Sequence, residues 1–193
     1  MTTATHASPA LTSGSASAAR ILDVGCGDAR DPRATDGIDI RSYANVSIVH
    51  DLERFPWPIA PDTFDRVILR DVIEHLDDVV RTMEELHRIC KPGGRIEIWT
   101  PHYAHPNSFH DPTHKHHFSF GTFDYFTGDR AYPRYLSCEF RMAEKRLIFD
   151  KHELIGKLLA TLSSRVYEKQ FSHQFPPRGM YFEIEVVKTP SAR

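Results

Sequence analysis

The sequence predicts an α/β fold, a single doubly wound domain built on a seven-stranded, mostly parallel sheet. Three observations support this fold class. Short apolar runs alternate with helical stretches along the chain. The first run, Ile21–Val24, ends abruptly at the glycines of Asp-Val-Gly-Cys-Gly. Asp39 lies at the end of the second strand and Asp51 follows the third, which places polar residues at the carboxyl edge of the sheet, where ligands usually bind.

The expected strands are apolar or alternating runs bounded by turn residues. Pro56, Pro58 and Pro61 mark a loop between the third and fourth strands, and Gly93-Gly94 precedes the fifth. The seven runs are 21–24, 37–40, 46–50, 65–69, 95–100, 140–149 and 180–188.

Helices are expected between the later strands. After Asp77 and Asp78, which are candidate N-caps, apolar residues recur at helical spacing up to Cys90. A short helix is expected over 118–126 and an amphipathic helix over 152–170. Only eleven residues separate Gly27 from Asp39, and Pro32 is among them, so at most about one helical turn fits there.

Length and composition indicate one globular domain. The chain has 193 residues, of which 40% are hydrophobic and 26% charged. Residues 1–19 consist mostly of Ser, Thr and Ala, and we expect them to form a disordered tail. The folded domain is expected over 20–190, with a lid rich in histidine and aromatic residues at 101–133.

Charge and cysteine content exclude several classes of protein. The formal net charge of −2 gives no basic footprint, so nucleic acid is an unlikely partner. Three widely spaced cysteines form neither a disulfide framework nor a thiolate metal site, which fits a reducing cytoplasm. We find no signal peptide and no apolar run of the ~20 residues that cross a bilayer. We therefore expect a soluble cytoplasmic protein without membrane contact; no feature indicates an oligomeric state.

Four motifs in order give the chain a family resemblance. Asp-Val-Gly-Cys-Gly at 23–27 is followed by the strand-end Asp39, by Glu-His-Leu at 74–76 and by Lys-Pro-Gly-Gly at 91–94. Over 20–99 the chain resembles the class I S-adenosylmethionine-dependent methyltransferases. A dinucleotide fingerprint would need a third glycine where Arg30 stands.

The resemblance implies a fold, an activity and a cofactor. It implies a Rossmann-like sheet whose last strand is antiparallel. It also implies an enzyme that binds S-adenosyl-L-methionine and methylates N, O or S of a small-molecule acceptor by in-line displacement.

The resemblance also assigns the cofactor to particular residues. It implies that Asp23 holds the amino group of the methionine moiety while the glycine loop lets that moiety lie against the strand end. Asp39 is expected to bind the ribose hydroxyls, and Ile40 to flank the adenine. Asp51 and Leu52 are expected to contact the adenine edge, and Arg70 the methionine side. The expected cofactor-binding set is Asp23, Gly25, Cys26, Gly27, Asp39, Ile40, Asp51, Leu52 and Arg70.

Candidate catalytic residues follow the fourth and fifth strands. Asp71 can orient a nucleophile or cap a turn. Residues 102–117 carry six histidines, for which three interpretations stay open: a solvated polar lid, a general base or a metal site. The base would come from His102, His110 or His114. A metal would be held by His110, Asp111 and His114 or by His114 and His116, but we assign no residue to a metal, and a divalent metal cofactor stays an open alternative.

Two other functions compete with the enzyme. One is a metal-binding protein that uses the histidines of 102–117. The other is a non-catalytic partner subunit with the same fold. An intact glycine loop favours the enzyme.

Overall fold

The computed structural model describes residues 18–127 and 138–188. Residues 1–17 of the expected tail and 128–133 of the expected lid lie outside these ranges.

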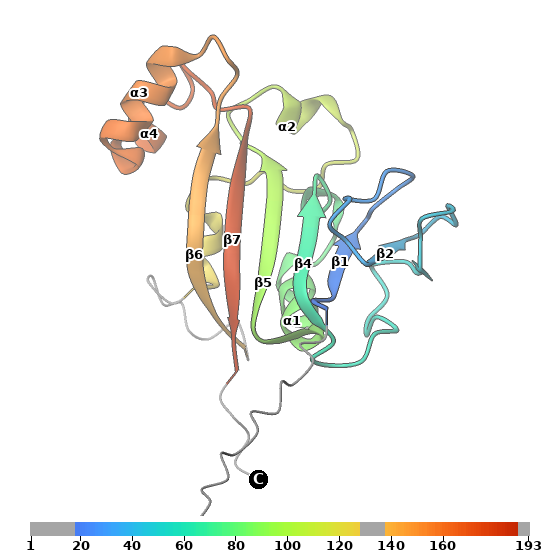
Figure 1. Ribbon diagram of the computed structural model, residues 1–193. Coiled ribbons are helices and arrows are strands. Elements are labelled where there is room, and N and C mark those ends of the chain that lie inside the picture. The colour runs from blue at the N-terminus through green and yellow to red at the C-terminus, as the bar shows by residue number, and fades with distance from the viewer. Residues whose placement is uncertain (1–17, 128–137, 189–193) are drawn as a thin grey trace, which may run out of the picture.

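Seven strands form one sheet in the order β3-β2-β1-β4-β5-β7-β6 (Figure 1). The strands are β1 (Ile21–Val24), β2 (Asp36–Asp39), β3 (Ile48–Val49), β4 (Phe64–Arg70), β5 (Cys90–Pro101), β6 (Glu139–Ile148) and β7 (Gly179–Val187). β1 pairs in parallel with both β2 and β4, whereas β7 is antiparallel to β5 and β6. The expected α/β sheet with an antiparallel last strand is therefore confirmed.

The strand order reverses between β1 and β4. The chain runs outward from β1 through β2 to β3 and then returns to the other side of β1. In α/β sheets, ligands bind in the crevice at such a switch point, beyond the carboxyl ends of the strands. The glycine loop after β1 begins at this crevice.

Helices join the strands at one face and at one end of the sheet. They are η1 (Ile73–His75), α1 (Val79–Ile89), α2 (Asn107–His110), η2 (Thr122–Tyr125), α3 (Leu154–Leu162) and α4 (Ser164–Gln170). α1 begins as expected, because a side-chain oxygen of Asp78 accepts a hydrogen bond from the Arg81 amide over 2.8 Å.

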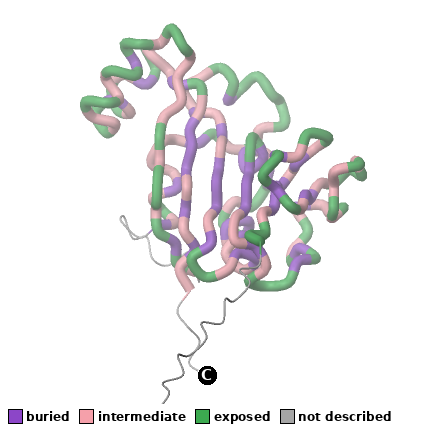
Figure 2. The backbone as a smooth tube through the Cα atoms, viewed as in Figure 1, coloured by how far each residue is buried: buried purple, intermediate pink, exposed green. Residues whose placement is uncertain are grey.

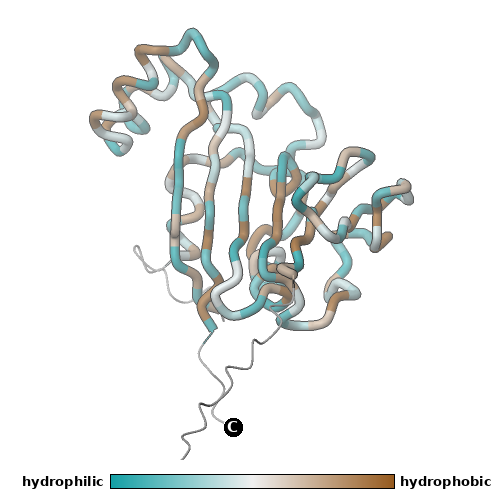
Figure 3. Tube along the Cα trace, viewed as in Figure 1, coloured by the Kyte–Doolittle hydropathy of each residue, from teal (hydrophilic) through white to brown (hydrophobic). Residues whose placement is uncertain are grey.

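The apolar core lies between the sheet and α1, which is behind the strands in Figure 1. The fully buried side chains of Met83, Leu86 and Ile89 on α1 belong to the same core as those of β4 and β5. In Figures 2 and 3 the central strands carry the purple and brown segments of this core.

The other face of the sheet is charged. Arg66 of β4, Arg95 and Glu97 of β5, and Glu183 and Glu185 of β7 share it by register. Among the described residues no helix covers this face, which is turned to the viewer in Figure 1. No helical turn forms between β1 and β2, where ion pairs connect the loop to the sheet instead.

Three expected elements are shorter or divided. The helix expected over 152–170 is two helices, because Ser163 is extended (φ −163°, ψ 104°) and its side chain caps α4. The helix expected over 118–126 is only the 3₁₀ turn η2, since the Thr122 hydroxyl binds the Ser119 amide. The strand expected over 46–50 shrinks to β3, which pairs only with β2 at the sheet edge.

The surface of α3 is unusually apolar. Four of its side chains are more than half exposed: Leu154, Ile155, Leu158 and Leu162. Among residues 18–127 and 138–188, no helix has both the length and the apolar character that crossing a bilayer requires.

Candidate functional site

The loop after β1 depends on two glycines in the left-handed region. Gly25 has φ +64° and Gly27 has φ +53°. A Cβ on Gly25 would lie 2.6 Å from Val72 Cγ2, so this glycine also permits close packing against the segment after β4. A Cβ on Gly27 would meet no atom within 4 Å. The backbone at Gly27 therefore faces open space, where a ligand can approach it.

Asp39 holds this loop from the end of β2. Its Oδ2 accepts a hydrogen bond from the Gly27 amide and its Oδ1 one from the Arg41 amide, each over 2.9 Å. Each carboxylate oxygen keeps a second lone pair for ligand hydroxyls. The neighbouring Ile40 is 62% exposed, an apolar side chain beside the carboxylate. Both features suit a nucleoside, with hydroxyls on Asp39 and a base on Ile40.

Cys26, between the two glycines, lines the hollow beside Asp23. Its side chain is buried, and a Cβ on Gly37 would lie 2.7 Å from the Cys26 sulfur. Burial raises the pKa of the Cys26 thiol to about 11, with added contributions from the charges of Asp23 and Asp39. The thiol is therefore protonated near neutral pH and is no nucleophile.

Asp23 is a buried carboxylate without an ion pair among the described residues. It is 6% exposed, and its Oδ2 accepts a hydrogen bond from the Asp31 amide over 2.7 Å. Burial raises the pKa of Asp23 above its ordinary value. A hollow of about 100 Å³ adjoins this carboxylate and is lined by Asp23, Gly25, Cys26, Ala29, Asp31 and Arg70. An ammonium group placed there would supply the cation that Asp23 lacks.

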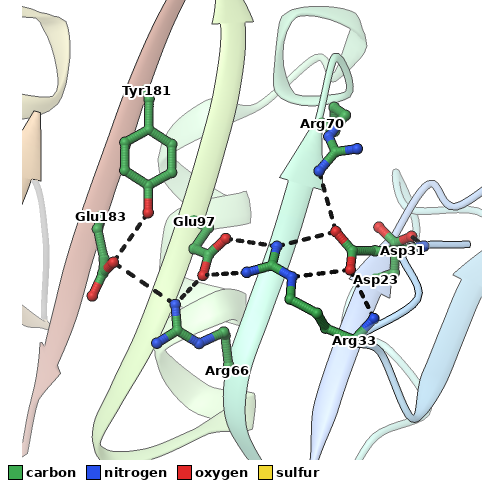
Figure 4. A network of polar contacts seen from close by, with 8 residues as sticks. All are labelled: Asp23, Asp31, Arg33, Arg66, Arg70, Glu97, Tyr181 and Glu183. Atoms are coloured by element: carbon green, nitrogen blue, oxygen red, sulfur yellow. Dashed lines mark hydrogen bonds and ion pairs between the residues drawn. The ribbon is translucent and has the colours of Figure 1, made fainter. Parts of the chain in front are cut away.

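A network of ion pairs ties the loop to the sheet (Figure 4). Arg33 donates to Asp31 and also, over 3.2 and 3.0 Å, to both carboxylate oxygens of Glu97 on β5. Hydrogen bonding from Arg33 lowers the pKa of Asp31. Arg66 joins Glu97 to Glu183, whose carboxylate accepts from a tyrosine on β7, Tyr181. Sequence reasoning missed this network, although Glu97, a charge between Ile96 and Ile98 in a buried strand, was a signal for it.

Asp51 and Leu52 form a turn after β3. Asp51 Oδ1 accepts from the Glu53 amide over 3.1 Å, and the Leu52 carbonyl accepts from the Trp57 indole over 3.0 Å. Among the described residues, no hydrogen-bond partner is found for the Leu52 amide. This donor is thus free for an acceptor such as an adenine nitrogen.

Arg70 lies between two hollows. Its guanidinium is 3.1 Å from Asp31 and stacks over the Trp99 ring at 4.9 Å. It lines the hollow beside Asp23 and also a larger cavity of about 400 Å³ at the carboxyl ends of β4 and β5. Asp71 also lines this cavity and has φ +52°, a backbone conformation that is uncommon for a residue with a side chain. Arg178 lines the cavity as well.

The three histidines expected as bases lie in different environments. His102 is fully buried; its Nδ1 accepts from the Ala104 amide, and its Nε2 is 3.0 Å from a carboxylate oxygen of Glu168. This histidine joins the end of β5 to α4 and does not line the cavity. His110 is exposed at the end of α2.

Of these three histidines, His114 is the one whose charge acts on Asp71, as does the charge of His75. His114 lies close to Glu74 and His75. One nitrogen or carboxylate oxygen from each of the three, an atom that could bind a metal ion, lies within 4.8 Å of the other two. Burial raises the pKa of Glu74 to about 7. His116 contacts the Asp77 carbonyl and His117 the Ser108 hydroxyl, so the structure brings neither to this group.

The residues around the glycine loop fit S-adenosylmethionine. Asp23 offers a carboxylate for the ammonium, Arg70 a guanidinium for the methionine carboxylate, and Asp39 acceptors for the ribose. The Leu52 amide and the exposed Ile40 suit the adenine. Of the expected cofactor residues, Asp23, Gly25, Cys26 and Arg70 line the hollow at the switch point between β1 and β4. The others lie in the glycine loop or where β2 and β3 end.

Comparison with known proteins agrees with this geometry. A family model described as a methyltransferase domain matches residues 6–133, about two thirds of the chain. No match is found among curated proteins.

Solved structures with the same fold include several methyltransferases. An S-adenosylmethionine-dependent methyltransferase from Archaeoglobus fulgidus has a TM-score of 0.63 at 20% identity, over 86% of each chain. One from Mesorhizobium loti has a TM-score of 0.58 at 16% identity, over 86% of this chain and 90% of that one. A phosphoethanolamine N-methyltransferase from Haemonchus contortus, solved with phosphomonomethylethanolamine and S-adenosylhomocysteine, has a TM-score of 0.56 at 17% identity, over 89% and 49% of the two chains.

The similarity to solved structures is a similarity of fold. The family model covers the glycine loop and the strands β1 to β5, whose ends form the crevice. The chain belongs to the methyltransferase-domain family, and it has the fold of the S-adenosylmethionine-dependent methyltransferases.

Proposed function

We propose that this enzyme methylates a small molecule that binds in the cavity lined by Arg70, Asp71, Trp99 and Arg178. The observation that carries the proposal is the position of this cavity, which shares Arg70 with the hollow beside Asp23. Its volume of about 400 Å³ lies within the range typical of small-molecule sites.

The charges of the cavity favour an acceptor with an anionic group. Arg178 is 56% exposed and lies 3.7 Å from Asp150, a loose pair that leaves its guanidinium free for a further partner. Trp99 contributes a flat aromatic wall, packed against the Tyr181 ring at 4.7 Å. We infer an acceptor that carries a carboxylate or phosphate near its methylated N, O or S atom. The Haemonchus enzyme named above is solved with phosphomonomethylethanolamine, a molecule that carries a phosphate.

The cofactor-binding residues act by positioning. When bound, S-adenosylmethionine supplies a methyl group already activated by a sulfonium. The glycine loop and Asp39 would hold the nucleoside part, and Asp23 and Arg70 the amino-acid part. Alignment of the acceptor by Arg178 and Trp99 then provides much of the rate, because oriented reactants gain large effective concentrations.

A neutral acceptor also has to lose a proton. Of the four residues expected to act in catalysis, Asp71 lines the cavity, and the charge of His114 acts on Asp71. We assign acceptor activation to these two residues. His102 is engaged by Glu168 and His110 lies exposed on α2, so neither is part of the assignment. The cytoplasmic location expected from the cysteines belongs to this proposal too.

The test measures S-adenosylhomocysteine release with panels of amines, alcohols and thiols, each with and without a carboxylate or phosphate. Arg178→Met should raise the KM for an active anionic acceptor at least about tenfold, the value of one charge-assisted contact. It should leave S-adenosylhomocysteine affinity unchanged. Arg165→Met, an arginine on α4, is the matched control. Equal activity with neutral and anionic acceptors would contradict the inferred anion, and turnover only on a macromolecule would contradict the small-molecule assignment.

A further inference from the structure

Glu74, His75 and His114 form a group that the glycine loop and the cavity leave unexplained. Glu74 and His75 lie in η1, directly after β4, and His114 lies in the loop after α2. One potential ligand atom from each lies within 4.8 Å of the other two. The sequence pairings of His114 with His110 or His116 do not include this group, because Glu74 and His75 lie far from His114 in the sequence.

Backbone hydrogen bonds hold the two segments together. The Glu74 carbonyl accepts from the Lys115 amide over 2.9 Å and from the His116 amide over 3.1 Å. The His75 and His114 rings consequently lie 4.7 Å apart at an angle of 69°. The group is thus prearranged by the fold.

Hydrogen bonding determines which ring nitrogen of His75 and of His114 carries a proton. His114 Nδ1 is 3.0 Å from the Ser108 carbonyl, which can only accept, so Nδ1 carries the proton. His75 Nδ1 is 2.9 Å from the Thr113 hydroxyl, which gives its single proton to Asp111 over 2.7 Å. His75 Nδ1 must therefore donate as well.

Both Nε2 atoms are left with a lone pair and, among the described residues, without a hydrogen-bond partner. A histidine that donates from Nδ1 to an oxygen and presents Nε2 has the arrangement of most metal ligands.

Glu74 provides an independent observation. Its side chain is 1% exposed; Oε2 accepts from the Thr100 hydroxyl over 3.1 Å, whereas Oε1 is buried without a partner among residues 18–127 and 138–188. A buried carboxylate oxygen without a partner is costly. A cation at this position would compensate for it.

We propose that Glu74, His75 and His114 bind a divalent transition-metal ion through one carboxylate oxygen and two Nε2 atoms. Two imidazoles and one carboxylate suit Zn²⁺, Fe²⁺, Co²⁺ or Mn²⁺ better than Mg²⁺ or Ca²⁺. Ligands of one ion at about 2.0–2.2 Å lie at most about 4 Å apart, so small side-chain rotations close the site. Three protein ligands leave coordination positions open, as in catalytic metal sites.

The open positions would serve the acceptor, and this step rests on the proposed function. Thr100, which binds Glu74, and Asp71, which lies within range of both histidines, line the acceptor cavity. A bound ion lowers the pKa of a coordinated hydroxyl. The acceptor is then an alcohol or phenol: its O–H proton passes to Asp71 or water, its oxygen bonds to the methyl carbon, and the electrons of the broken C–S bond stay on sulfur. His114 acts here as a ligand instead of a free base.

The test is calorimetric titration of Zn²⁺, and separately Mg²⁺, into the full chain after tag removal and chelator treatment. We expect one equivalent of Zn²⁺ to bind, with at least about tenfold weaker binding in Glu74→Gln, His75→Ala and His114→Ala. His110→Ala, an exposed histidine four residues from His114, is the matched control and should bind as the wild type does. The visible spectrum of the Co²⁺ form should change in the three ligand variants and not in the control.

The outcomes separate this inference from the proposed function. Absence of one-to-one Zn²⁺ binding in protein that binds S-adenosylhomocysteine would overturn the metal site and leave the methyltransferase assignment intact. An equal loss of Zn²⁺ affinity in His110→Ala and His114→Ala would also overturn the metal site. Zn²⁺ binding that needs all three ligands supports the site, even where no acceptor in the panel is methylated.

Discussion

The guanidinium of Arg33 donates hydrogen bonds to both carboxylate oxygens of Glu97, 64 residues later in the chain, over 3.2 and 3.0 Å. This pair fixes the loop after β1 to the middle of β5. Since no helix among the described residues covers that face of the sheet, the ion pairs of Arg33 take over the task of holding the cofactor loop in place. The crevice thus depends on electrostatics at a position where apolar packing is missing.

Removing Glu97 should destabilise the fold and loosen the loop. Glu97→Ala leaves Arg33 and Arg66 without their shared partner, and because both are partly exposed, we expect a loss of about 1–3 kcal/mol. Urea unfolding measures this loss, and a double-mutant cycle with Arg33→Ala should give a favourable coupling. Arg54→Ala, which breaks an exposed pair with Asp51, is the control and should change stability by less than about 0.5 kcal/mol. A loss in Glu97→Ala no larger than in the control would contradict this role.

The two loop glycines should respond differently to alanine. Gly25→Ala combines a left-handed backbone with a contact of 2.6 Å to Val72 and should cost markedly more stability than Gly27→Ala. Gly27→Ala should cost about 1–2 kcal/mol of backbone strain alone. It should nevertheless weaken S-adenosylhomocysteine binding, since its new methyl group would occupy the open space. Unfolding and binding titrations of both variants test this, and unchanged affinity in Gly27→Ala would place the ligand elsewhere.

We expect Asp23 to lower the stability of the fold at pH 7 while it strengthens binding of S-adenosylhomocysteine. A carboxyl group whose folded pKa is raised contributes its full stability below its unfolded pKa, and this contribution is lost as pH rises through the folded pKa. Because burial raises the pKa of Asp23, its ionised form costs stability at pH 7. Asp23→Asn should therefore be at least as stable as the wild type at pH 7, while binding S-adenosylhomocysteine about tenfold or more weakly.

The pH dependence of unfolding supplies the check for Asp23. The difference in free energy of unfolding between Asp23→Asn and the wild type should shrink as pH falls toward 3.8, the ordinary value for Asp. A variant that is less stable at pH 7 yet binds normally would show that Asp23 serves the fold and not the ligand.

We expect His102 to stabilise the fold and to take no part in catalysis. Its fully buried ring pairs with Glu168, so His102→Ala should cost about 2–4 kcal/mol of stability by urea unfolding. Binding of S-adenosylhomocysteine should remain, with the exposed His110→Ala as a control that changes neither. Normal stability with lost turnover would restore His102 as a catalytic base.

The crevice at the strand ends was predictable from sequence because its signals are local. Gly25 and Gly27 mark a turn after an apolar run, and Asp39 and Leu52 follow the next two strands. The topology then brings these strand ends together by rule. The sheet and its antiparallel last strand followed from the family resemblance.

The parts that were missed depend on contacts between distant segments. Glu97 pairs with Arg33 only after the sheet brings the loop that follows β1 close to β5. No periodicity in the sequence predicts that pair. His114 meets Glu74 through a backbone contact, whereas sequence spacing favoured its neighbours His110 and His116. The break at Ser163 was overlooked because apolar residues continue on both sides of it.

The central claim is that the crevice beside Asp39 binds the cofactor, and calorimetric titration of S-adenosylhomocysteine in the presence of chelator tests it most directly. We predict saturable one-to-one binding by the wild type and by Asp62→Ala, an aspartate at the opposite end of the sheet. Asp39→Ala should bind about tenfold or more weakly, since it loses charge-assisted hydrogen bonds. Failure of the wild type to bind, or equal affinity in Asp39→Ala and Asp62→Ala, would contradict the account.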